Sequence, residues 1–83
     1  MKLENKWLEV VKLEDIKTVE DKQNLESELR EVVHYLVKFR GITKAFIARS
    51  AGLSTQHFNN FSNSISEISL KNCFKLLDFL RKY

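Results

Sequence analysis

Side chains that can hydrogen-bond to the edges of nucleic-acid bases are concentrated between residues 54 and 63 of this 83-residue chain. Gln56 and Asn60 carry amides, which can form paired hydrogen bonds with the major-groove edge of adenine. Thr55 offers a hydroxyl and a methyl group, and the methyl suits thymine. The same stretch holds further polar side chains at Ser54, His57, Asn59 and Asn63. These residue types are typical of a surface that contacts base pairs.

An ordinary polar helix surface is the alternative interpretation of these residues. Asparagine is a poor helix former, so the adjacent Asn59 and Asn60 cost helix propensity. A surface selected only for stability would more often carry Glu, Lys or Ala, and we therefore favour base contact. His57 can reach a phosphate or a base, or it can remain solvated. Asn63 lies in a polar connector that can either meet the phosphate backbone or form a plain loop.

The elements expected to position these side chains are two short helices over residues 44–51 and 55–61. Gly52 lies where the first helix must end, because glycine enters the left-handed conformation without steric cost. Ser54 follows as a natural N-cap of the second helix. Two helices joined in this way form a helix-turn-helix, whose second helix lies in the DNA major groove. Apolar residues recur at helical spacing in both helices, at Ile47, Ala48, Ala51, Phe58 and Phe61.

Longer helical patterns flank this pair and predict an all-α fold, a compact helix bundle. One helix is expected from about Asp21 or Asn24 to Arg40, with Gly41 as its C-cap. Another is expected from the N-cap Ser69 to about residue 81, on an apolar stripe that includes Cys73 and predicts a buried thiol. The chain has no proline and only two glycines, whereas a strand-rich fold needs more turn residues.

Residues 1–20 form an N-terminal extension to a domain predicted over residues 21–83. The stretch from Lys6 to Leu13 is rich in strand formers, which favours a short strand followed by a helix. Such a strand could pair with the same segment of a second chain, so the extension is a candidate dimerisation segment. The other candidate is the last helix, whose broad apolar arc needs burial on more than one side. The alternative is an amphipathic helix running through Leu13, Ile16 and Val19. We expect Trp7 to be a packing anchor rather than a nucleotide stacker.

Charge is distributed unevenly along the chain. Residues 1–29 hold five lysines against eight acidic residues, whereas residues 30–83 hold nine basic residues against three acidic ones. A positive segment that carries a helix-turn-helix pattern favours nucleic acid as the partner. So small a core favours a homodimer as a source of further burial. The sequence has no apolar run long enough for a membrane span and no signal-peptide pattern, so we expect a cytoplasmic protein.

The residues from Arg40 to Leu80 resemble the helix-turn-helix domain of Cro and the lambda-type phage repressors, the xenobiotic-response-element family. This resemblance covers about half of the chain and implies a bundle of four or five helices that binds operator DNA, usually as a dimer. It rests on Ile47, Ala48, Gly52, Leu53, Ser54, Phe58 and Phe61, and on a closing helix with Ser69, Leu70, Phe74, Leu77 and Leu80.

The resemblance also implies roles for individual residues. Thr55 and Gln56 occupy positions where family members touch bases, and Asn60 follows one turn later on the same face. Lys44 stands where many members carry a glutamine that meets the DNA backbone; a lysine can hold a phosphate there but does not copy the amide geometry. The extension before about Asp21 is not part of the family's minimal pattern.

Two classes of function remain open on this basis. The first is a sequence-specific DNA-binding regulator, a phage- or plasmid-type repressor that binds double-stranded DNA. The second is a protein-interaction module, such as an antitoxin, inhibitor or anti-activator, with the Trp-bearing extension as its partner surface. We expect no enzyme, cofactor or metal site, because the sequence has no Gly-rich phosphate loop and no HExxH or CxxC motif. The paired acids at residues 14–15 and 20–21 are expected to be solvated.

Overall fold

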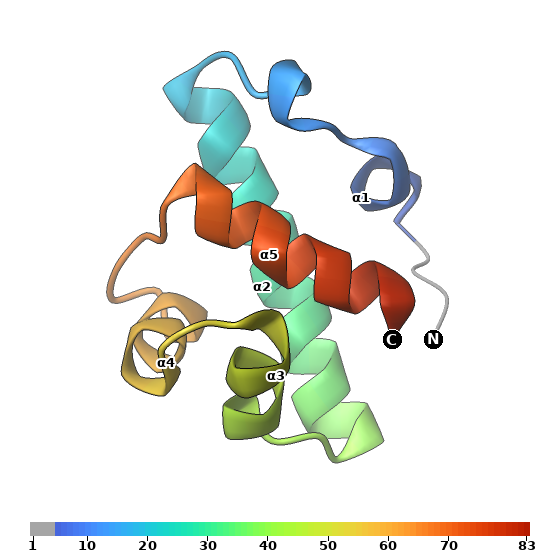
Figure 1. The fold of residues 1–83 in the computed structure, drawn as a ribbon, viewed down its shortest axis with the longest axis vertical. Helices are drawn as coiled ribbons and strands as arrows, with labels where there is room; N and C mark the ends of the chain where they lie inside the picture. The colour runs from blue at the N-terminus through green and yellow to red at the C-terminus, as the bar shows by residue number, and fades with distance from the viewer. Residues whose placement is uncertain (1–4) are drawn as a thin grey trace.

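Five α-helices and one 3₁₀ turn, joined by short connections, form residues 5–83, the part of the chain that the computed structural model describes (Figure 1). The elements are α1 (Lys6–Val10), η1 (Leu13–Asp15), α2 (Val19–Arg40), α3 (Lys44–Ala51), α4 (Thr55–Ser62) and α5 (Leu70–Lys82). The all-α prediction is therefore confirmed. Within residues 5–83, no helix combines the length and the apolar character that crossing a bilayer demands.

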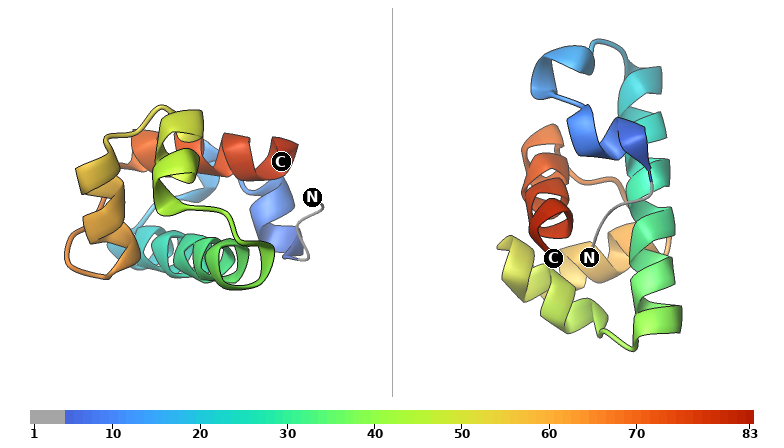
Figure 2. Two further views of the ribbon diagram at one scale, coloured as in Figure 1. Left: turned by 90° about the horizontal axis from the view of Figure 1, so that it is seen from below. Right: turned by 90° about the vertical axis from the view of Figure 1, so that its right-hand side faces the viewer.

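The two longest helices, α2 and α5, form opposite layers of the bundle (Figure 2). Helices α3 and α4 pack between these layers at one end, and α3 contacts both α4 and α5. Helix α1 lies at the other end, beside the C-terminal half of α5 (Figure 1). The helix-turn-helix pair is therefore held between two longer helices, as the flanking patterns predicted.

Helix α2 begins earlier than predicted, at Val19, because its N-terminus carries a capping box. The Thr18 hydroxyl accepts a hydrogen bond from the Asp21 amide at 3.0 Å, and the Asp21 carboxylate accepts from the Thr18 amide at 3.2 Å. These two bonds satisfy backbone donors that have no partner within the helix. The helix ends as predicted at Gly41, whose φ of 68° is left-handed.

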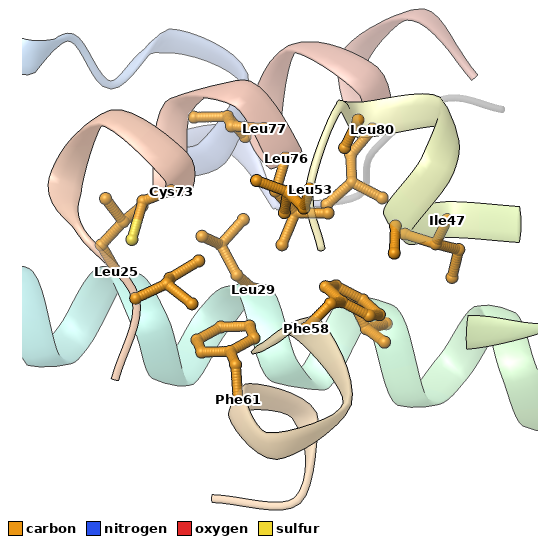
Figure 3. Close-up of a cluster of buried hydrophobic side chains, with 14 of the residues drawn as sticks. Leu25, Leu29, Ile47, Leu53, Phe58, Phe61, Cys73, Leu76, Leu77 and Leu80 are labelled. Atoms are coloured by element: carbon orange, nitrogen blue, oxygen red, sulfur yellow. The ribbon is translucent and has the colours of Figure 1, made fainter. Parts of the chain in front are cut away.

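The hydrophobic core lies where α2, α3, α4 and α5 meet (Figure 3). Phe58 and Phe61 of α4 are fully buried and point toward the leucines of α2 and α5. Burying one such side chain stabilises the fold by about 1.5–3 kcal/mol. The most deeply buried partners from the other helices are Leu25, Leu29, Val33, Leu36, Ile47, Ala48, Cys73, Leu76, Leu77 and Leu80.

The prediction of a strand over Lys6–Leu13 is wrong, since residues 6–10 form helix α1. The helix is capped by the Asn5 side chain, which accepts a hydrogen bond from the Leu8 amide at 3.1 Å. Leu8 is fully buried in the core, and it anchors the helix in place of Trp7, which remains 38% exposed. Leu8 and Val11 both face the bundle, a spacing of three that suits a helix and not a strand.

Contacts from the far end of the chain hold α1 in place. Arg81 donates hydrogen bonds to the carbonyl oxygens of Leu8 at 2.9 Å and Val11 at 2.7 Å. The Asn5 amide also donates to the Glu28 carboxylate on α2. The alternative amphipathic helix is absent too, because η1 ends at Asp15 and Ile16 is extended. Of the proposed dimerisation segment, residues 1–4 lie outside the described part of the chain.

Candidate nucleic-acid interface

The corner between α3 and α4 has the predicted glycine turn and serine N-cap. Gly52 adopts φ 76° and ψ 30°, which ends α3 in the left-handed conformation. The Leu53 amide then donates to the Ala48 carbonyl at 2.8 Å, which satisfies a carbonyl at the end of α3. Leu53 itself is buried, and the Ser54 hydroxyl accepts from the His57 amide at 3.4 Å as the N-cap of α4. The start of α4 is thereby fixed relative to α3.

Helix α4 has one buried face and one polar face. Phe58 and Phe61 are fully buried, with their ring centroids 6.2 Å apart. On the polar face, Gln56 is exposed and Asn60 is half-buried, so both lie outside the core, as predicted. The remaining candidates on α4 and at its N-cap are also exposed: Ser54, Thr55, His57 and Asn59.

The amides of the polar face have no hydrogen-bond partner within the described part of the chain. The side chains of Gln56, Asn59 and Asn60 form no hydrogen bond to another group among residues 5–83. Each amide has two N–H donors and a carbonyl acceptor. These groups are consequently available to a partner outside the chain.

Lys44 and Asn63, the two candidates that flank the helix pair, lie beside each other. The Lys44 ammonium donates to the Asn63 side-chain oxygen at 3.0 Å, which connects the start of α3 with the residue after α4. A lysine has three donors, so two remain for other acceptors. The arrangement suits a phosphate oxygen at this edge of the helix pair.

The charge of the chain segment that forms this helix pair is one-sided. Between Glu31 and Glu67 the chain has no acidic residue, whereas it has four lysines or arginines, at Lys38, Arg40, Lys44 and Arg49. Helices α3 and α4 and the corner between them lie entirely inside this stretch. The two helices themselves therefore carry basic side chains and no acidic ones, which favours the attraction of polyanions.

Two residues of α2 that sequence reasoning did not connect with α4 hold its C-terminal end. The Arg30 guanidinium donates from Nε to the Phe61 carbonyl at 2.7 Å and lies 4.5 Å from the centre of the Phe61 ring. His34 donates from Nε2 to the Ser62 carbonyl at 2.8 Å. A signal did exist, since residues 30 and 34 are four apart and flank the apolar stripe of α2.

Cys73 is buried, as predicted. Burial raises the pKa of the Cys73 thiol to about 12, and the negative charge of Glu26 contributes to this rise. A thiol with this pKa stays protonated and is a poor nucleophile near neutral pH.

Among residues 5–83, no three His, Cys, Asp or Glu side chains are grouped so that they could hold a metal ion.

Comparisons with protein-family models, curated proteins and solved structures find no match for this chain. The likeness to the Cro and lambda-type repressors remains a prediction from the residues named above.

Proposed function

We propose that this chain is a sequence-specific DNA-binding regulator, a phage- or plasmid-type repressor that inserts α4 into the major groove. The observation that carries the proposal is the polar face of α4. There the side chains of Gln56 and Asn60 have no hydrogen-bond partner among residues 5–83, while two buried phenylalanines on the opposite face fix the helix. The eight residues of α4 span about 12 Å at the usual rise, a length that suits the major groove.

Base contacts and phosphate contacts come from different residues in this proposal. Thr55, Gln56, Asn59 and Asn60 meet base edges, and an amide placed against adenine discriminates by about 1–3 kcal/mol. Ser54 and His57 lie at the entry of the helix, where a phosphate or a base is within reach. Lys44 and Asn63 meet the phosphate backbone, together with nearby basic residues. Affinity accordingly falls steeply as salt rises, because bound phosphates release their counterions.

The proposed working form is a homodimer in the cytoplasm. A single eight-residue helix reads only a few base pairs, and two copies related by a two-fold axis read two half-sites about one helical turn apart. The proposal involves no catalytic step and no cofactor.

The experiment is a selection of binding sites from a random duplex library, followed by affinity measurements at fixed salt. Wild type is expected to enrich a defined site. Gln56→Ala should weaken binding to that site by about 5- to 150-fold, which corresponds to the loss of one paired base contact. The matched control is Gln23→Ala, because Gln23 is an exposed amide near the start of α2. If the two variants bind the selected site equally well, α4 is not the reading helix.

A protein-interaction module is the second candidate function, favoured by exposed apolar side chains near the N-terminus. Val10 and Val19 are 67% and 74% exposed, and Leu13 is 59% exposed, in a segment rich in acidic residues. Exposed apolar side chains mark a surface that binds another protein when they form one contiguous patch. A mobility shift with random duplex at low salt separates the candidates, because a pure interaction module gives no shift.

A further inference from the structure

Three polar side chains of α2, Glu26, Arg30 and His34, follow one another at intervals of four residues. This spacing places them on one face of the helix. We refer to Glu26, Arg30 and His34 as the α2 ladder. Each of them bonds to a backbone group of the segment 61–68, which runs from the end of α4 to the approach to α5.

The Glu26 carboxylate holds the far end of this segment. It is 1% exposed, and it accepts a hydrogen bond from the Ile68 amide at 3.1 Å. Its other oxygen lies 3.7 Å from the Lys22 ammonium. A buried carboxylate is costly unless such partners satisfy it, so the contact constrains both α2 and residue 68.

Arg30 and His34 hold the near end of the segment. Arg30 donates to the carbonyls of Phe61 at 2.7 Å and Ser66 at 3.4 Å, and His34 donates to the Ser62 carbonyl at 2.8 Å. The last carbonyls of a helix lack partners within the helix, and they carry partial negative charge. The two α2 side chains supply donors for these carbonyls.

The segment between these contacts is constrained as well. Ser64 has a φ of 61°, an uncommon left-handed conformation for a residue other than glycine. Its amide donates to the Phe61 carbonyl at 3.0 Å, the same oxygen that accepts from Arg30. Such strain persists where the surroundings over-determine the backbone, and the ladder contributes to this by holding Phe61, Ser62 and Ser66 on either side of Ser64.

We infer that Arg30 and His34 are positioning residues that set the angle of α4 on DNA without touching it. This inference rests on the proposed function. The glycine corner fixes the start of α4, and the ladder fixes its end. Asn60 and Asn63 lie near the end held by the ladder, whereas Gln56 lies near the corner. Loss of the ladder therefore impairs the base contact of Asn60 and spares the base contact of Gln56.

The test compares variants at the selected site and at random duplex. Arg30→Met keeps the apolar stem of the side chain and removes its donors. The double variant Arg30→Met/His34→Ala is expected to bind the selected site about tenfold more weakly, which is the loss expected for one base contact. Its affinity for random duplex should change little. Discrimination should disappear at the base pairs beside Asn60 and persist at those beside Gln56. Replacing His34 by glutamine instead of alanine (His34→Gln) should recover most of the selected-site affinity that depends on the His34 hydrogen bond. The glutamine side chain has an N–H that can donate from a similar position.

Two further measurements separate positioning from plain destabilisation. Val33→Ala truncates a fully buried side chain of α2 outside the ladder, and it should lower stability without changing the ratio of selected-site to random affinity. Hydrogen exchange of the Ile65 amide, which donates to the Asn60 carbonyl at 2.9 Å, should be faster in the double variant than in Val33→Ala.

The outcomes distinguish the inference from the function on which it rests. A wild-type chain that binds no duplex refutes both. A wild-type chain that selects a site, alongside a folded double variant with an unchanged affinity ratio, refutes only the positioning role. An equal fall in the ratio of selected-site to random affinity in Val33→Ala also refutes the positioning role, because the fall would then follow from lower stability alone.

Discussion

The glycine at the helix-turn-helix corner offers a quantitative test of the geometry. A Cβ atom added at Gly52 would have no neighbouring heavy atom within 4 Å, so Gly52→Ala introduces no clash. The remaining cost is that of a left-handed backbone at φ 76°, about 1–2 kcal/mol for an L-residue. Alanine also lowers the conformational entropy of the unfolded chain, which stabilises the folded state by about 0.4–1 kcal/mol. We therefore expect a net loss of about 1 kcal/mol in the free energy of unfolding.

The assay is equilibrium unfolding in urea, supported by thermal melting. A loss of this size lowers the Tm of a domain with 60–100 residues by about 4–8 °C, and it leaves the urea m-value unchanged. Gly41→Ala is the matched control, because Gly41 has φ 68° and equally open space around its Cβ position. The two variants should lose the same stability. Gly52→Asn should lose less, because asparagine tolerates this conformation better.

Two results would refute this reasoning. A loss above about 3 kcal/mol for Gly52→Ala, with a small loss for Gly41→Ala, would exceed the cost of left-handed backbone and would mean that the corner is crowded. A gain in stability would mean that residue 52 does not adopt a left-handed backbone in solution.

Two further predictions concern titratable groups. Cys73 should resist a thiol reagent at pH 8 in the folded protein, because burial raises its pKa to about 12. It should react rapidly in denaturant. Rapid labelling of the folded protein would contradict the burial of Cys73. Hydrogen bonding from the Lys17 amide lowers the pKa of Asp21, so the unfolded chain binds the proton more tightly. The stabilisation is present above the unfolded pKa of about 3.9 and is lost as the pH falls through the lowered folded value. Asp21→Asn should therefore flatten the decline of urea-measured stability below about pH 4, and an unchanged decline would contradict the capping role.

The parts of this fold that the sequence predicts are those specified by neighbouring residues. Ser69 caps α5, as its position before an apolar stripe indicated, and Thr43 caps α3 in the same way. The left-handed glycines end their helices for the same local reason. The two faces of α4 also follow from helical spacing, which places Phe58 inside and Gln56 outside.

The parts that the sequence did not predict depend on contacts between distant residues. The β propensity of Trp7, Val10 and Val11 was outweighed by the burial of Leu8 and by hydrogen bonds from Arg81. The contacts of Arg30 and His34 were missed because their acceptors are backbone carbonyls 28 to 36 residues away. A backbone carbonyl is present at every residue, so the sequence does not show which carbonyl accepts the hydrogen bond.

The hydrogen bonds from Arg81 to α1 have a consequence for the order of assembly. They join residues 70 and 73 positions apart, and closing a flexible loop of that length costs on the order of 4 kcal/mol in chain entropy. That cost is offset only after α2 and α5 have already brought the intervening chain together. We therefore expect α1 to dock last during folding and to detach first during native-state fluctuations, as the least protected cooperative unit of the chain.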